Sequence, residues 1–124
     1  MDSGTTDVLN VVDFQDFKKL DIRVAKVIKV EDHPNADKLY LVTAEIDQSG
    51  DGIKIEKTFV AGIKNSYSKE ELLGKLLVVI NNLKPAQIRG VTSSAMLLAA
   101  STKDKKNIVV LTPDKPIDIG SKVS

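Results

Sequence analysis

The sequence predicts an all-β protein, a small β-barrel that forms a single domain. With 124 residues, the chain is long enough to close one barrel around one core and short for two domains. Segments of strand length, rich in β-branched residues, recur along the chain, and clusters of Gly, Pro, Asn and Asp separate them. The continuous apolar run at residues 76–80 indicates a buried strand.

The first half of the chain is expected to hold a polar arm and three strands. The arm covers residues 1–13 and ends at Asp13, which is placed to N-cap a short helical turn. It carries a small apolar patch made of Val8, Leu9, Val11 and Val12. The strands are expected at residues 22–30, 39–46 and 53–60, separated by a loop at 33–37 and a hairpin loop at 47–52.

The second half is expected to hold one short helix and the remaining strands. Ser68 and Glu71 have the spacing of a capping box, and Gly74 ends the helix that they open. Further strands are expected at residues 76–80, 94–100 and 107–111, with turns at 81–86 and 101–106 and a C-terminal tail after 112–114.

Five main strands with a short helix between the third and the fourth form the layout of an OB-fold, whose strands and loops commonly bind oligonucleotides. The number of strands alone also fits a β-sandwich, and the position of the helix favours the barrel. The chain is therefore divided into an arm, residues 1–13, and an OB-fold domain with its C-terminal tail, residues 14–124.

Charge is distributed unevenly along a chain whose formal net charge is +1. Residues 1–51 hold 6 Lys and Arg against 11 Asp and Glu, residues 52–106 hold 10 against 4, and residues 107–124 hold 2 against 2. A chain that is neutral overall can thus present one basic face, and the face attracts phosphates. An ordinary lysine-rich surface gives the same count.

The sequence offers no catalytic or metal-binding constellation. It has no cysteine and one histidine, His33, so a zinc site lacks ligands. It contains no nucleophile elbow, no glycine-rich phosphate loop and no EF-hand loop. We expect a non-catalytic binding module without cofactor or metal, in which His33 is a loop residue before a proline.

Residues 81–90 have the composition of a binding loop. Two cations, Lys84 and Arg89, lie five residues apart among three amide side chains and the turn residues Pro85 and Gly90. Such a loop can neutralise phosphates and form hydrogen bonds with sugar hydroxyls or base edges. An ordinary polar loop between strands looks the same. Aromatic residues make up only 4% of the chain and are mostly expected in the core, which favours recognition of a folded RNA over general single-strand binding.

Five motifs occur in a fixed order along the chain: residues 21–27 (DIRVAKV), 33–40 (HPNADKLY), 60–63 (VAGI), 82–90 (NLKPAQIRG) and 93–101 (SSAMLLAAS). With them the chain resembles the tRNA-binding domain family over about residues 14–123. That family includes the C-terminal domain or separate β chain of methionyl-tRNA synthetases, free-standing dimeric tRNA-binding proteins, and the domain of endothelial-monocyte-activating polypeptide.

The resemblance implies an OB-fold that holds the outer corner of L-shaped tRNA by shape. It implies a cytoplasmic role in protein biosynthesis, as a tRNA-binding module or subunit that assists an aminoacyl-tRNA synthetase, with the methionyl enzyme as the expected partner. Carried over by position, it assigns RNA binding to Asp37, Lys38, Asn82, Lys84, Arg89, Ser93 and Met96. From the residues alone, a strand hydroxyl is the favoured role of Ser93 and a core gap-filler is the favoured role of Met96.

Two further expectations follow from the resemblance. Many members have Gly where this chain has Ala25 and Ala95, and a methyl group there is expected to reduce close approach to a ligand. Free-standing members are commonly homodimers. The arm and the tail residues Ile117 and Ile119 are the candidates for such an interface.

Other functions remain open at this point. One branch of the family consists of chaperones that handle secretory precursors, which is the principal alternative. A signalling polypeptide is less favoured because residues 1–7 do not resemble a signal peptide, although such members are released without one. A general oligonucleotide- or oligosaccharide-binding OB-fold is the fourth candidate function.

Overall fold

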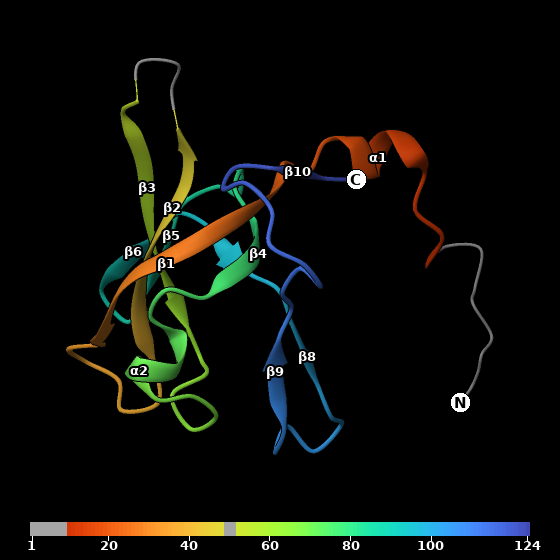
Figure 1. The fold of residues 1–124 in the computed structure, drawn as a ribbon. Helices are drawn as coiled ribbons and strands as arrows, with labels where there is room; N and C mark the ends of the chain where they lie inside the picture. Colours follow the sequence, from red (N-terminus) through yellow and green to blue (C-terminus); the bar gives the residue numbers. More distant parts are fainter. Residues whose placement is uncertain (1–9, 49–51) are drawn as a thin grey trace.

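The structure is a computed structural model that describes residues 10–48 and 52–124, and it confirms the predicted all-β fold class (Figure 1). The expected patch residues Val8 and Leu9 lie outside the described residues. Within the described part, the elements in chain order are α1 (Phe14–Lys18), β1 (Ile22–Asp32), β2 (Tyr40–Gln48), β3 (Lys54–Ala61), α2 (Lys69–Leu72), β4 (Leu76–Ile80), β5 (Ala86–Ile88), β6 (Val91–Ser93), β7 (Met96–Leu97), β8 (Ala99–Ser101), β9 (Ile108–Val110) and β10 (Lys122–Val123).

The main sheet is antiparallel, with the strand order β3-β2-β1-β4-β7 and with β10 also paired to β1. Its strands cross at large angles in Figure 1, as they do in a sheet that curls into a barrel. Two small hairpins, β5–β6 and β8–β9, extend from this sheet. The short helix α2 lies between β3 and β4 along the chain, as predicted.

Strand β1 pairs with β4 and β2 along different halves of its length, and it bends between them. Its first half, from Ile22 to Lys26, pairs with β4, and its second half, from Lys26 to Asp32, pairs with β2. The register with β2 shifts between Val27 and Lys29, which marks a bulge. A bulge raises the local twist and bends the strand, so this shift helps to turn a flat ladder into a curled one.

One core fills the curled sheet. Alternate residues of β2 point inward and are buried: Tyr40, Val42, Ala44 and Ile46. Phe59 of β3 and Leu77 and Val79 of β4 are fully buried against them, and Leu72 of α2 belongs to the same cluster. This set confirms residues 76–80 as a buried strand. Three of the five aromatic residues serve this core or its edge, whereas Phe14 and Phe17 of α1 are exposed.

The capping box predicted at the start of α2 is present. The Ser68 hydroxyl accepts a hydrogen bond from the backbone N–H of Glu71, and the Glu71 carboxylate accepts one from the backbone N–H of Ser68. Asp13 also takes the N-cap position of α1, but its side chain makes no capping hydrogen bond. None of the described helices has the length and apolar character needed to cross a membrane.

The last strands differ from the prediction. The stretch expected as one strand, residues 94–100, is divided into β7 and β8, because the chain leaves the main sheet after Leu97 and enters the β8–β9 hairpin. The segment expected as a long polar turn instead leads into the β5–β6 hairpin. These strands have two or three residues each, too few for a clear alternation of apolar and polar positions.

Candidate nucleic-acid interface

The residues assigned to RNA binding come from several segments, and the structure gathers most of them at two hollows of the surface. Asp37, Lys38 and Arg89 line a groove of about 430 Å³, here called the loop groove, whose walls include Ala36 and Leu39. Lys84, Ser93 and Met96 line a pocket of about 180 Å³, here called the Met96 pocket. Asn82 lines neither of them.

The loop groove forms where the β5–β6 hairpin meets the loop between β1 and β2. Arg89 and Gly90 make the two-residue turn of the hairpin, with φ angles of 54° and 88°. Two positive φ angles in succession are typical of a type I′ turn, which suits the twist of a hairpin. The turn thereby places the Arg89 side chain at the exposed tip of the hairpin.

Two side chains fix this hairpin against the β1–β2 loop. The buried His33 ring accepts a hydrogen bond from the Asn35 backbone N–H at Nδ1 (2.9 Å), so that its Nε2 donates to the Ile88 carbonyl (3.0 Å). The Asn35 amide donates to the Arg89 carbonyl (3.0 Å), and the Arg89 guanidinium donates to the Asn35 carbonyl (3.2 Å). His33 is therefore a loop residue before a proline whose buried ring also connects the β1–β2 loop to the β5–β6 hairpin.

The Met96 pocket lies beside the same hairpin. Its walls come mostly from apolar side chains, among them Val60, Leu83 and Ile88. Met96 is 44% exposed, so it is not the core gap-filler that its residue type allows. A flexible thioether side chain at the rim of an apolar pocket can pack against the flat face of a base or a sugar. Lys84 supplies the positive charge at this rim.

Ser93 lies beneath this pocket and holds the barrel together. It is 7% exposed, and its hydroxyl accepts a hydrogen bond from the Val60 N–H (3.0 Å) and donates to the Ala95 carbonyl (3.2 Å). Ser94 adds two hydrogen bonds to the carbonyl of Thr58. These bonds join β3 to the segment before β7, and this junction is called the seam below.

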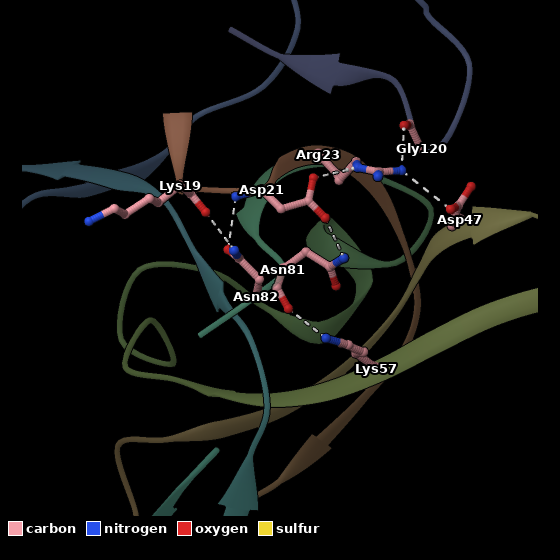
Figure 2. Close-up of polar contacts among 8 residues, drawn as sticks. All are labelled: Lys19, Asp21, Arg23, Asp47, Lys57, Asn81, Asn82 and Gly120. Carbon is pink, nitrogen blue, oxygen red and sulfur yellow. Dashed lines mark hydrogen bonds and ion pairs between the residues drawn. The ribbon is translucent and has the colours of Figure 1, made fainter. Parts of the chain in front are cut away.

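Asn82 is used in a similar way at the base of the loop that carries Lys84 (Figure 2). Its amide oxygen accepts from the Asp21 N–H (2.8 Å), and its amide nitrogen donates to the Lys19 carbonyl (2.7 Å). Both functional groups of the side chain are thus occupied by the protein. The structure places Asn82 and Ser93 where they hold binding segments, with their polar groups already paired.

A polar network continues from this point across the end of the barrel (Figure 2). The Asp21 carboxylate accepts hydrogen bonds from Arg23 Nε (2.7 Å) and from the Asn81 amide (2.9 Å), and together these hold the pKa of Asp21 below its usual value. Arg23 also pairs with Asp47 (3.3 Å). The Lys57 ammonium donates to the Asn81 carbonyl. This network ties β1, β2, β3 and the end of β4 together beneath the Lys84 loop.

The cations at the two hollows have no acidic partner among the described residues. Lys38, Lys84 and Arg89 make no ion pair within residues 10–48 and 52–124. Other lysines are paired with carboxylates: Lys19 with Asp16, Lys29 with Glu31, Lys54 with Glu45, and Lys64 and Lys69 with Asp32. The unpaired cations keep their charge available for a phosphate.

The structure corrects the expectation about Ala25. This residue is fully buried in the core cluster, so its methyl group fills the interior and does not face a ligand. Ala95 is also buried in that cluster, although it contributes to the wall of the Met96 pocket. In the described part of the chain, no three His, Asp or Glu side chains are grouped so that they could hold a metal ion.

Comparison of the sequence with known proteins finds a tRNA-binding family model and methionine–tRNA ligases. The family model described as "Putative tRNA binding domain" matches residues 22–122. A methionine–tRNA ligase of Nanoarchaeum equitans is 54% identical over 113 residues, which are 91% of this chain and 14% of the ligase. The corresponding enzyme of Pyrococcus horikoshii is 48% identical over 115 residues, 93% of this chain and 15% of the ligase. The chain thus spans about a seventh of the length of these relatives.

Two solved structures share the fold. The "MetRS related protein" of Pyrococcus horikoshii superposes with a TM-score of 0.79 at 31% identity, covering 92% of this chain and 98% of that one. The "CsaA chaperone protein" of Picrophilus torridus superposes with a TM-score of 0.78 at 32% identity, covering 92% and 100%.

Proposed function

Since this chain belongs to the tRNA-binding domain family, we propose that it is a structure-specific module that holds the outer corner of folded tRNA. The observation that carries this proposal is the set of hydrogen bonds by which His33 and Asn35 join the β1–β2 loop to the β5–β6 hairpin. It holds two segments that are more than 50 residues apart in the sequence, so that Lys38 and Arg89 line one groove. Cations fixed on a rigid scaffold suit the phosphates of an RNA whose own shape is fixed.

In this proposal, each accessible residue of the site makes a different kind of contact with the RNA. Lys38, Lys84 and Arg89 contact phosphates, whereas the Asp37 carboxylate accepts a hydrogen bond from a ribose 2′-hydroxyl or a base amino group. Met96 packs against a base or a sugar at the pocket rim. Asn82 and Ser93 act as positioning residues, because the protein itself already occupies their polar groups.

The module serves an aminoacyl-tRNA synthetase, and the ligase relatives make the methionyl enzyme the favoured one. In this role the chain carries no reaction of its own. It adds tRNA affinity to a catalytic chain, as part of protein biosynthesis in the cytoplasm. Tethered or associated binding raises the effective concentration of the tRNA near the catalytic site.

The chain acts as a homodimer in this proposal. Val11 and Val12 of the arm are 61% and 68% exposed, and Phe14 and Ile117 are exposed as well. Ile119 is half-buried and contributes less free surface. A twofold pairing through these apolar side chains would cover them and double the basic surface.

The test measures binding of the purified chain to folded bulk tRNA, to the same RNA held unfolded, and to a single-stranded oligonucleotide, each at several salt concentrations. We expect preference for the folded RNA and a strong salt dependence. The slope of log K against log salt is negative. The double variant Lys84→Ala, Arg89→Asn should make this slope shallower by about 1.5, for two lost phosphate contacts. Asn is chosen at position 89 because it tolerates a positive φ.

The matched control is Lys26→Ala with Lys115→Ala, which removes two exposed lysines that line neither hollow. An equal loss of slope in the control would mean that net charge alone sets the affinity, against the proposed site.

A secretion-chaperone-like function is the second candidate, and the similarity to the CsaA chaperone protein favours it. The surface next to α1 offers an apolar groove of about 380 Å³, lined by Phe14, Phe17, Leu20 and Val123 among others. Binding of unfolded polypeptide, without salt-sensitive affinity for any RNA, would support this candidate and contradict the first.

A further inference from the structure

The loop groove is the first of three hollows that share their walls. Lys38 and Leu39 line both the loop groove and a second groove of about 550 Å³, which reaches Lys105 and Lys106 of the β8–β9 hairpin. Asn65 and Ser66, with Lys106 and Ile108, line the second groove and also a third of about 390 Å³. Neighbouring hollows thus share lining residues all the way from Arg89 to the β8–β9 hairpin. This row of three hollows is called the lysine track.

Positive charge dominates the far end of the lysine track. Lys106 has no ion pair among the described residues, and the Lys105 ammonium donates one long hydrogen bond, to the Ser101 hydroxyl (3.3 Å). The acid of the same turn, Asp104, is held by the Thr102 hydroxyl (2.7 Å) and by the Lys106 backbone N–H (3.0 Å). The backbone N–H of Lys106 and the Thr102 hydroxyl keep the pKa of Asp104 below its usual value. Asp104 stays ionised in this turn, but its carboxylate makes no ion pair with Lys105 or Lys106 within the described residues.

Hydrogen bonds within the turn hold the backbone that presents these lysines. The Lys105 N–H donates to the Thr102 carbonyl (2.9 Å), and the Asn107 N–H donates to the Thr102 hydroxyl (3.2 Å). Lys105 has a φ of 62°, a left-handed conformation that costs a lysine energy and that Gly or Asn adopts more easily. The backbone thus fixes the direction in which the two lysines leave the hairpin.

We propose that the lysine track binds the sugar-phosphate backbone of the tRNA. In this arrangement Lys105 and Lys106 contact phosphates beyond those held by Lys38 and Arg89, and the Asn65 amide and Ser66 hydroxyl donate hydrogen bonds to the same strand. Three connected hollows suit a polyanion, which presents one phosphate after another, better than a single small anion. This inference rests on the proposed tRNA-binding function and extends its footprint to the β8–β9 hairpin.

The test compares Lys105→Asn with Lys106→Gln, as a double variant, with the wild-type chain and with the control Lys103→Gln, Lys115→Gln. Lys103 lies in the same turn but lines none of the three hollows, so the control removes equal charge. Asn keeps the left-handed backbone at position 105. For folded tRNA, the track variant should make the negative slope of log K against log salt shallower by about 1.5. The control should leave this slope unchanged.

Circular dichroism spectra would establish that both variants are folded. If the wild-type chain binds tRNA and the Lys84, Arg89 variant loses slope while the track variant does not, the lysine track is overturned and the proposed function stands. If track variant and control lose the same slope, the effect is one of net charge, and the track is again overturned. If the wild-type chain binds no tRNA, the proposed function fails first.

Discussion

At the seam of the barrel, Ser93 uses one hydroxyl group for two hydrogen bonds, one to each side. The Val60 N–H that it binds belongs to β3, which lies at the edge of the main sheet among the described residues. The sequence could identify the exposed cations Lys84 and Arg89, because charge and turn residues are local signals. It could not identify the hydrogen bonds that Asn82 makes with Lys19 and Asp21, or the one that Ser93 accepts from Val60, because these partners lie 33 to 63 residues away along the chain.

Replacing Ser93 by Ala should destabilise the protein by about 0.5–1.5 kcal/mol, because the half-buried Val60 N–H would lose its acceptor. The free energy of unfolding is measured by urea denaturation, with Ser124→Ala, an exposed serine, as the control. An unchanged midpoint for Ser93→Ala would show that the hydroxyl does not hold the seam.

At the scale of elements, the long strands, α2 and the turn between β8 and β9 were predictable, whereas the β5–β6 hairpin was not. β1 to β4 have enough residues for their β-branched composition and apolar pattern to stand out, and the capping box marks α2. The β5–β6 hairpin has three residues in each strand and is positioned by His33 and Asn35 from another loop. Tertiary contacts, and not local propensity, decide where such an element lies.

The network of Figure 2 should make the end of β1 sensitive to acid. Because Arg23 and Asn81 hold the pKa of Asp21 below its usual value of 3.8, the unfolded state binds this proton more readily than the folded state. The resulting stability is present above that value and is lost as the pH falls through the lowered pKa.

The variant Asp21→Asn should therefore be less stable than the wild type at pH 7, and its stability should fall less steeply below pH 4. Urea midpoints across this range give the comparison, with the exposed Asp114→Asn as the control. Asp32 and Asp104, whose pKa values are also lowered, remain in both proteins and leave a common background. Parallel curves for wild type and Asp21→Asn would refute the role of Asp21.

At the scale of the whole molecule, α1 and β10 meet at one end of β1, because β10 pairs with the residues that follow α1. The uneven charge of the sequence allowed a basic face, and Lys38, Arg89, Lys105 and Lys106 line neighbouring hollows of the proposed tRNA-binding surface. The arrangement of that face over two hairpins and one loop depends on how the barrel curls, which composition does not specify.

If the arm forms the proposed dimer interface, deleting residues 1–12 should convert a dimer into a monomer in sedimentation experiments. The milder variant Val11→Ser, Val12→Ser removes the exposed apolar side chains and keeps the length of the arm. Loss of the dimer should also weaken tRNA binding through lost avidity. A deletion variant that still sediments as a dimer would place the interface elsewhere.

The Arg89–Gly90 turn has a consequence for how this domain can change over evolution. A type I′ turn favours Asn at its first central position, and a long cationic side chain there holds the backbone in a conformation it does not prefer. If Arg89 contacts RNA as proposed, selection for a more stable hairpin and selection for tighter RNA binding would act on this residue in opposite directions. Relatives that have given up RNA binding would be free to relax this turn, so the residue at this position is a marker of which demand prevails.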